Sequence, residues 1–402
     1  MACRAGREYP MTRETLAGKQ IVVAVTGSIA AVEVVKLIHE LRRHGAIVQA
    51  VMSDAAAGII SPEALTYASG RPAITRITGL VEHVTWCGDD GMADLLLIAP
   101  CTANTISKIA CAIDDTPVTT FATTALGRGM PVLVVPAMHH SMFRHPGLAE
   151  NLRRIEAWGV EVIGPRIEEG KAKIAGTGEI VLACERAVLG RPLAGKHVLI
   201  TSGPCREPVD DVRILTTRSS GQMGRALALE AFRLGADVTV VHNDSFPCVR
   251  NIPAGTAREM HDQVLHQMDE RGGTDIYISA AAISDFAPER AAGKIPSGKP
   301  VSISLRPLPK LLETVQSAYN PFTVAFKIGR RPETKARAMI RQGVAMVLMN
   351  TPETMGSSHG NYILLDAEGT TPIDGTKDEI AASVWSRIIQ RMAQARPGTG
   401  PS

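Results

Sequence analysis

A loop rich in glycine and hydroxyl side chains in the second half of the chain has the residue types that bind phosphate. The apolar run 197–200 ends at Thr201-Ser202-Gly203-Pro204, and Ser219-Ser220-Gly221 precedes the apolar-periodic segment 225–234. This order predicts a strand, a loop and a helix. Small residues at a helix start leave backbone N–H groups bare, and the helix dipole favours an anion there. We therefore expect a phosphate group at this helix start.

A second interpretation of the loop is that Gly221 and Gly224 only let the helix pack closely on the strand. A strand-to-helix connection typically takes about 2 to 6 residues. The connection here, from 201 to 218, takes roughly 18 residues. That length favours a functional loop, and both interpretations stay open at this point.

Three polar clusters in the first half have a similar character. Each follows an apolar run, and their hydroxyl groups, amide and helix starts would form a nest for one phosphate and one polar heterocycle. Their members are Gly27 and Ser28, then Ser53, then Thr102, Asn104 and Thr105. The alternative is ordinary helix capping by Ser28, Thr102 and Asn104. The presence of all three clusters favours a binding site over capping.

The elements that position these clusters alternate between strands and helices. Short continuous apolar runs followed by amphipathic segments are typical of a parallel sheet covered on both faces, whose ligands bind beyond the carboxyl ends of the strands. Strands are expected at 20–26, 46–52, 94–99, 132–135, 160–163, 197–200, 237–241, 275–278, 322–326 and 344–349. Helices are expected at 32–41, after Thr102, and at 146–158, 225–234, 257–268, 333–341 and 377–392, with a hairpin near 362–365.

The chain is too long for one ordinary hydrophobic core. It has 402 residues, 45% of them hydrophobic, and two domains are the simplest division. A segment containing proline and glycine at 189–195 precedes a new strand and predicts the boundary. The expected fold class is α/β, with two Rossmann-like domains at 1–190 and 191–402.

Composition excludes several classes of partner. The formal net charge is only +3 and no long run of lysine or arginine occurs, so nucleic acid is not expected, while small anionic substrates stay open. The seven cysteines are scattered without a C-x-x-C pair, and no apolar run reaches the ~18 residues of a membrane span. A cytoplasmic protein is expected. Residues 1–10 are expected to be a tail, or Met11 is the true start.

Two sets of motifs resemble one enzyme family. GPCREPVDDVR at 203–213, followed by RSSGQMG at 218–224, resembles the ligase half of the bifunctional phosphopantothenoylcysteine decarboxylase/phosphopantothenate–cysteine ligases of coenzyme A biosynthesis. GSIAA at 27–31, APCTANTISKIA at 99–110 and VPAM at 135–138 are similar to signatures of homo-oligomeric, FMN-containing cysteine decarboxylases. The resemblance covers residues from about 18 to 392.

For the first half, this resemblance implies an FMN-dependent decarboxylase. The FMN would be held by Gly27, Ser28, Ser53, Thr102, Asn104 and Thr105. His83 sits at the place of the family's catalytic histidine, and Met138 and His139 would bind substrate. The chain departs from the family in having His139 in place of an asparagine and no cysteine in the flap at 169–176. Lys173 or Lys171 would replace this cysteine as proton donor, or the last reduction uses another donor or is impaired.

For the second half, the resemblance implies a ligase that uses CTP and Mg²⁺. Asp285 would act through the metal ion or the ribose, Lys294 on phosphate and Phe326 against the base, and Pro309 and Lys310 would complete the substrate site. The catalytic position that is usually asparagine is Thr217, and the usual lysine of the glycine-rich motif is Gln222. CTP and ATP therefore both stay open as the nucleotide.

Together these features predict two steps of coenzyme A biosynthesis. CTP would activate 4′-phosphopantothenate as an acyl-cytidylate for attack by cysteine, and the product would then be decarboxylated to 4′-phosphopantetheine. The resemblance also implies a homo-oligomer built from trimers, up to a dodecamer. Two alternatives are a regulatory protein that binds flavin and nucleotide, and an enzyme with only one working half.

Overall fold

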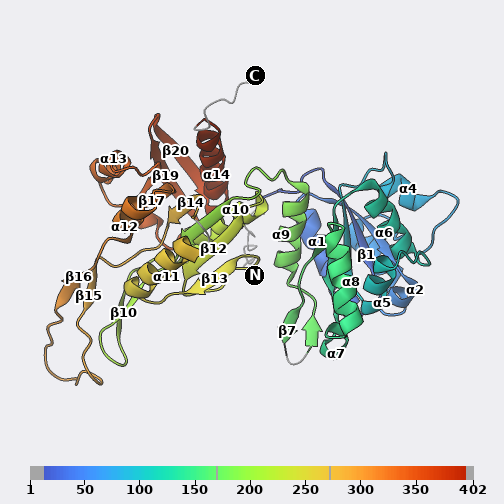
Figure 1. Ribbon diagram of the computed structural model, residues 1–402, viewed down its shortest axis with the longest axis horizontal. Helices are drawn as coiled ribbons and strands as arrows, with labels where there is room; N and C mark the ends of the chain where they lie inside the picture. Colours follow the sequence, from blue (N-terminus) through green and yellow to red (C-terminus); the bar gives the residue numbers. More distant parts are fainter. Residues whose placement is uncertain (1–12, 169–170, 271–272, 395–402) are drawn as a thin grey trace, which may run out of the picture. The chain divides into compact units, whose positions relative to one another are not determined.

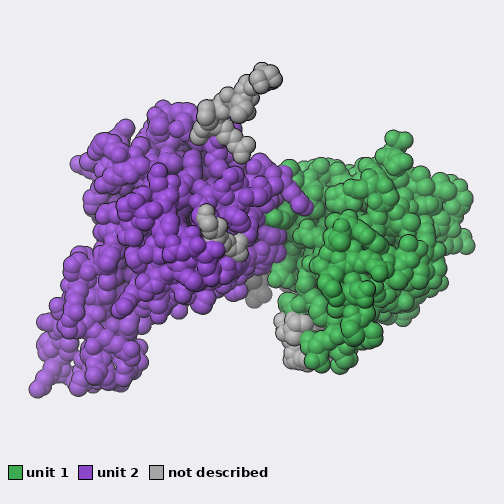
Figure 2. Space-filling model, viewed as in Figure 1, with its two compact units in different colours: residues 1–190 green, residues 191–402 purple. Residues whose placement is uncertain are grey.

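The computed structural model describes residues 13–168, 171–270 and 273–394, so the tail expected at 1–10 lies outside the described residues. The chain divides into two compact units, 1–190 and 191–402 (Figure 2). Each hydrophobic core is formed by residues of one unit alone. Among the described helices, none is long and apolar enough to cross a membrane.

The first unit is built on a five-stranded parallel sheet with the strand order β2-β1-β3-β4-β6. Its strands are β1 (Gln20–Val25), β2 (Ile47–Met52), β3 (Leu95–Cys101), β4 (Val132–Pro136) and β6 (Glu161–Val162). Its helices are α1 (Val34–Arg43), α2 (Asp54–Ala57), α3 (Pro62–Ser69), α4 (Glu82–Cys87), α5 (Ala103–Ala110), α6 (Pro117–Arg128), α7 (His140–Phe143), α8 (Pro146–Ala157) and α9 (Thr177–Val188). The expected parallel α/β architecture is confirmed.

Helices cover both faces of this sheet because successive strand residues point to opposite sides. Ile21, Val23 and Val25 of β1 join a core with α1, α3 and α9. The intervening Val22 and Ala24 join a second core with α4, α5, α6 and α8. The continuous apolar runs in the sequence are thus explained by burial on two sides.

The first helix begins later than the sequence predicts. A single 3₁₀ segment, Ile29–Glu33, follows Ser28, and α1 starts only at Val34. Val32, expected on the buried face, is instead 53% exposed. The apolar period of the helix is real, but it runs from Val34 to Leu41 because the 3₁₀ turn has a different residue spacing.

A small antiparallel sheet stands beside the main sheet of the first unit. It has the order β5-β8-β7 and consists of β5 (Met138–His139), β8 (Lys171–Lys173) and β7 (Arg166–Glu168). Met138 pairs with Ala172, and His139 pairs with Lys171. The segment after β4 and the flap sequence are therefore held together by backbone hydrogen bonds.

The second unit has an eight-stranded sheet with the order β13-β12-β9-β14-β17-β18-β19-β20, parallel up to β18. The strands are β9 (His197–Thr201), β12 (Asp237–His242), β13 (Arg250–Pro253), β14 (Ile276–Ser279), β17 (Phe322–Ile328), β18 (Met346–Asn350), β19 (His359–Asp366) and β20 (Gly369–Thr376). The helices are α10 (Gln222–Arg233), α11 (Ala257–Glu270), α12 (Leu311–Ala318), α13 (Glu333–Arg341) and α14 (Lys377–Gln394), with a 3₁₀ segment at Pro352–Thr354. The first six strands have the order of a Rossmann fold.

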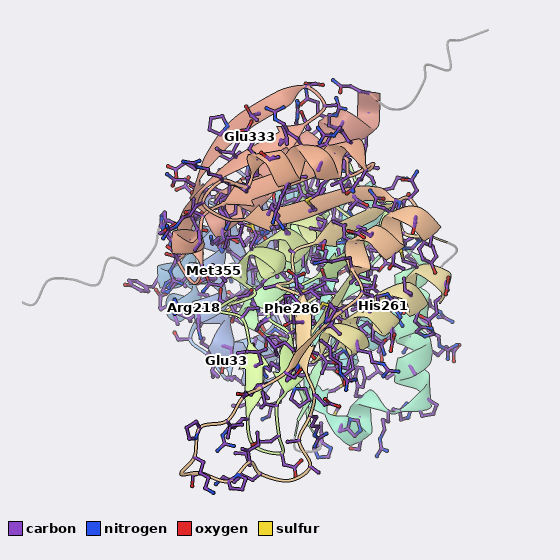
Figure 3. All side chains as sticks on the ribbon, turned by 90° about the vertical axis from the view of Figure 1, so that its left-hand side faces the viewer. Glu33, Arg218, His261, Phe286, Glu333 and Met355 are labelled. Carbon is purple, nitrogen blue, oxygen red and sulfur yellow. The ribbon has the colours of Figure 1, made fainter. Side chains whose placement is uncertain are left out.

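Two short antiparallel pairs leave the sheet of the second unit. β10 (Arg206–Pro208) pairs with β11 (Ile214–Thr216), and β15 (Phe286–Pro288) pairs with β16 (Leu305–Pro307). They form an arm that projects away from the sheet (Figure 1), and Figure 3 labels Phe286 at the start of β15. None of these strands was expected, since three residues are too few to show a period.

Candidate functional site

Thr26 joins two polar loops at the point in the first sheet where strand order reverses. β1 and β3 are neighbours, and such a switch point is where open α/β sheets bind ligands. The Thr26 hydroxyl donates to the Pro100 carbonyl at 2.7 Å and accepts from the Thr102 N–H at 3.0 Å. Sequence reasoning missed Thr26: the threonine directly before Gly27-Ser28 is visible in the sequence, but its burial is not.

The polar clusters of the first half divide into capping residues and residues with unused groups. Ser53 Oγ accepts from the Ala56 N–H at 3.3 Å, and Thr102 Oγ1 accepts from the Thr105 N–H at 3.3 Å. Both are helix caps. Ser28 makes no such bond, and the exposed Asn104 side chain has no hydrogen-bond partner among the described residues.

Gly27 is required by a close approach. A Cβ atom there would lie 2.5 Å from Cβ of Ala55, which is in α2. Any side chain would therefore push α2, and the Ser53 cap with it, away from the end of β1.

A pocket of about 890 Å³ brings four of the predicted site residues together. Its lining includes Ser28 from the loop after β1, Met138 and His139 from β5, and Lys173 from β8. His139 Nδ1 accepts from the Ser141 N–H at 3.4 Å and lies 2.8 Å from Ser141 Oγ. In the neutral ring this leaves the hydrogen on Nε2, so His139 can donate to an anion.

His83 lies apart from the lining of that pocket. It is in α4, which packs on α6, and its Nδ1 atom is buried without a hydrogen-bond partner among the described residues. Its neighbour Glu82 bonds to Thr78, and this hydrogen bonding lowers the pKa of the exposed Glu82 carboxyl. Within one copy of the chain, His83 and Lys173 therefore do not line the same pocket.

In the second unit, the glycine-rich loop combines packing with an open pocket. A Cβ atom at Gly224 would lie 2.2 Å from Ser202 Oγ, so this glycine serves close packing of α10 on the loop after β9. Gly221 has a left-handed φ of 72° and precedes α10. It also lines a pocket of about 390 Å³ with Ser202, Ser219 and Ser220. Both sequence interpretations therefore describe a part of this loop.

Thr217 carries an unusual hydroxyl group. Its Oγ1 atom is buried and has no hydrogen-bond partner among the described residues. The preceding residue differs, since Thr216 Oγ1 donates to the Cys205 carbonyl at 2.8 Å. Buried hydroxyls are normally paired, so that of Thr217 is a candidate for a ligand contact.

The residues predicted for the nucleotide site fall into separate places. Asp285 and Lys310 form an ion pair, and Lys310 lines a pocket of about 510 Å³. The Phe326 ring packs edge-on against Tyr362, with 6.4 Å between the ring centroids. Lys294 is exposed on the arm, as Pro309 is before α12.

Asp210 joins two segments of the arm that carries Lys294 through hydrogen bonds. Its buried carboxylate accepts from the backbone N–H groups of Val212, Arg213 and Ile295 at 2.8, 2.6 and 3.0 Å, and from the Arg213 guanidinium at 2.5 Å. Burial opposes ionisation, but these hydrogen bonds outweigh it and hold the Asp210 pKa well below its usual range. An Asp followed by backbone donors two and three residues on is an Asx turn, a signal that the sequence offered.

Among the described residues, no group of three or more His, Cys, Asp or Glu side chains is placed to hold a metal ion. Asp285 is thus a single candidate carboxylate. This arrangement fits Mg²⁺ bound together with a nucleotide, because Mg²⁺ commonly takes one or two carboxylates and completes its shell with phosphates and water.

Comparison with known proteins matches both halves of the chain. The family model "Flavoprotein" matches residues 11–189, and "DNA/pantothenate metabolism flavoprotein C-terminal domain" matches residues 193–392. Solved structures similar to single halves include the C-terminal domain of a CoaBC protein (26% identity, TM-score 0.43, 51% of this chain and 100% of that one) and the FMN-dependent cysteine decarboxylase SpaF (25%, 0.39, 43% and 99%).

Two relatives align along almost the whole chain. The coenzyme A biosynthesis bifunctional protein CoaBC of Thermococcus kodakarensis is 44% identical over 393 residues, which cover 94% of this chain and 97% of the relative. The CoaBC protein of Methanocaldococcus jannaschii is 33% identical, with 93% and 94% covered. With both halves matched in one continuous alignment, the chain belongs to the CoaBC family of bifunctional coenzyme A biosynthesis proteins.

Proposed function

We propose that this chain catalyses two consecutive steps of coenzyme A biosynthesis. Its second unit joins 4′-phosphopantothenate to cysteine at the expense of CTP, and its first unit decarboxylates the product to 4′-phosphopantetheine with FMN. The observation that carries the pair of activities is the continuous match to CoaBC proteins through both units. The proposal also names FMN as the cofactor, CTP as the nucleotide and Mg²⁺ as the metal ion.

Features of the first unit support FMN. Gly27 lets α2 and its Ser53 cap lie close to the end of β1, and the Ser28 hydroxyl and Asn104 amide have groups free for a ligand at the switch point. α5 begins at Ala103 after the Thr102 cap, and the backbone N–H groups of Ala103 and Asn104, which have no acceptor among the described residues, suit a phosphate. Bound there, FMN supplies reversible acceptance of a hydride from the carbon that bears the thiol.

The residues of the chain then position the substrate and move protons. His139 donates through Nε2 to the substrate carboxylate, and Met138 packs against the cysteine moiety. Lys173, in the same pocket, delivers a proton to the product carbon. His83 removes the thiol proton, and because it does not line this pocket, it serves the pocket of a second copy of the chain. The proposal therefore requires a homo-oligomer, and the resemblance to the family implies one built from trimers.

The ligase reaction activates a carboxylate that is otherwise a poor electrophile. The 4′-phosphopantothenate carboxylate oxygen attacks the α-phosphorus of CTP, and pyrophosphate leaves. The amine of cysteine then attacks the acyl carbon and releases CMP. Lys310 and Lys294 neutralise phosphate charge, Asp285 shares Mg²⁺ with the phosphates, and Thr217 stands at the acyl centre.

The proposal also covers the cellular compartment of the enzyme and its binding partners. The six cysteines that the structure describes are all free, which supports a reducing compartment such as the cytoplasm. Its partners are small molecules and further copies of itself. Ile29 and Leu80 are each 77% exposed, and burial against another copy would remove this apolar surface from water.

The test is turnover of the purified full chain with 4′-phosphopantothenate, cysteine, CTP and Mg²⁺, followed by mass spectrometry. Accumulation of 4′-phosphopantetheine is expected. In the Lys173→Met variant the cysteine adduct should accumulate instead, because only the first unit is altered. Failure to form the adduct with CTP or ATP would refute the ligase and favour a protein that only binds flavin and nucleotide.

A further inference from the structure

The pocket of about 890 Å³ in the first unit contains two cations that the decarboxylation chemistry does not use. Lys36 of α1 and Arg166 of β7 line it together with Met138, His139 and Lys173. A pocket of this volume holds a ligand much larger than a cysteine residue. The two additional cations therefore suit a second anionic group on the same substrate.

Lys36 is an exposed lysine that makes no ion pair in the part of the chain that the structure describes. Glu33, which is labelled in Figure 3, precedes it by three residues and lines the same pocket. Side chains at this spacing are often neighbours on a helix, yet these two are not paired. The Lys36 ammonium group can thus bind a ligand, whereas the Glu33 carboxylate would repel an anion beside it.

Arg166 lies at the opposite edge of the small sheet from His139. The order β5-β8-β7 puts β8 between their strands, and two inter-strand steps amount to about 10 Å. Arg166 Nε donates to the Ile174 carbonyl at 3.2 Å, which orients the guanidinium group. Since His139 is the residue proposed for the substrate carboxylate, an anion at Arg166 would be a different group of the same molecule.

We propose that Lys36 and Arg166 bind the phosphate group of 4′-phosphopantothenoylcysteine and make the first unit selective for a phosphorylated substrate. The carboxylate and the phosphate stand at opposite ends of this substrate, as His139 and Arg166 stand on opposite edges of the small sheet. Apolar side chains of Leu37 and Ile180 also line the pocket and suit the methyl groups of the pantoyl moiety. This inference rests on the proposed decarboxylase function and adds the residues that select the phosphate.

The test compares two ligands that differ only in the phosphate group. Binding of 4′-phosphopantetheine and of pantetheine to the purified full chain, with FMN added, is measured by calorimetry, because a reaction product binds without turnover. In Lys36→Gln the phosphorylated ligand should bind about three- to thirtyfold more weakly, while pantetheine binding stays the same. Lys36→Arg should keep the preference, since it retains the charge. Arg153→Gln removes an exposed cation from α8 outside the pocket and is the matched control, which should change neither affinity.

Glu33 provides a test with the opposite sign. Glu33→Gln removes the carboxylate near the proposed phosphate position, so 4′-phosphopantetheine should bind about two- to fivefold more tightly and pantetheine should not. Unchanged or weaker binding of the phosphorylated ligand would place the phosphate away from this wall and overturn the inference.

Turnover separates this inference from the proposed function. Decarboxylation of 4′-phosphopantothenoylcysteine and of pantothenoylcysteine is followed by mass spectrometry, and Lys36→Gln should raise the KM of the phosphorylated substrate without raising that of the other. If the wild type decarboxylates neither, but Lys36→Gln selectively weakens 4′-phosphopantetheine, the decarboxylase fails and the phosphate site stands. If the wild type is active but binds both products equally, or Lys36→Gln weakens both equally, the phosphate site fails and the decarboxylase stands.

Discussion

The Thr217 hydroxyl can distinguish a working ligase in the second unit from a protein that only binds a nucleotide there. It is buried without a described partner, so a purely structural threonine would gain nothing from it. We predict that Thr217→Val lowers the rate of cysteine adduct formation by about tenfold or more, because one transition-state hydrogen bond is lost. Mass spectrometry of timed reactions measures this rate.

The Thr217→Val variant also distinguishes an effect on the reaction rate from an effect on stability. Valine has the shape of threonine and removes an unpaired polar group, so the melting temperature should stay the same or rise. Thr216→Val is the matched control for stability, since it loses a hydrogen bond to the Cys205 carbonyl. An unchanged ligation rate in Thr217→Val would show that the hydroxyl has no part in the reaction.

At the scale of elements, Gly27 holds the end of β1 against α2. Because a Cβ atom there would meet Ala55 Cβ at 2.5 Å, we predict that Gly27→Ala displaces α2, costs about 1 to 3 kcal/mol of unfolding free energy and lowers FMN retention. Absorbance of the purified protein near the flavin bands measures retention. Gly127→Ala in α6 is the control, since no atom lies within 4 Å of its added methyl group. A Gly27→Ala protein with full FMN content would contradict the prediction.

The arm of the second unit depends on Asp210 in a comparable way. Ile295, next to Lys294, donates its backbone N–H to this carboxylate. We predict that Asp210→Asn speeds hydrogen exchange in residues 290–297 and slows ligation, while decarboxylation of added 4′-phosphopantothenoylcysteine is unchanged. Asp211→Asn should do little, because its ion pair with Arg290 is exposed. Equal exchange in the wild type and Asp210→Asn would refute this role.

The hydrogen bonds to Asp210 also make the stability of the arm depend on pH. The folded pKa lies below the unfolded value of about 3.9, so the stabilisation is fully present above that pH and is lost as the pH falls toward the folded pKa. Protection of the arm should therefore be constant near neutrality and decline only below about pH 4. The Asp210→Asn variant should lack this component of the decline in hydrogen-exchange measurements.

Elements with a long apolar period could be predicted from the sequence, and short or polar ones could not. Helix α13 has the bounds that were expected, Glu333–Arg341, because its pattern is undisturbed. The arm strands have three residues each and their pairing is decided by distant contacts such as that of Asp210. Thr26 was missed for a related reason: a threonine at the end of a strand acquires meaning only when the structure shows that its buried hydroxyl bonds to Pro100 and Thr102.

At the scale of the whole molecule, the chain carries two separately cored units. The switch-point clusters of the first unit share no residue with the arm of the second unit or with its pocket of about 510 Å³. The sequence indicated this division through the hinge near 190, and it indicated the binding edges through strand ends. What it could not indicate is that His83 lies outside the pocket that Lys173 lines, since that depends on how α4 packs.

Two separate cores predict that the units respond to their ligands independently. A ligand that binds only the folded state stabilises its own unit by about 2.7 kcal/mol at a hundred times its dissociation constant. Differential scanning calorimetry of the full chain should thus resolve two transitions, of which FMN raises one and CTP with Mg²⁺ raises the other. Gly27→Ala should weaken only the FMN-induced shift, and Lys294→Met should weaken only the CTP-induced shift. A single transition moved equally by either ligand would mean that the two cores unfold as one cooperative unit, and that a defect in one reaction can arise from a change in the other half.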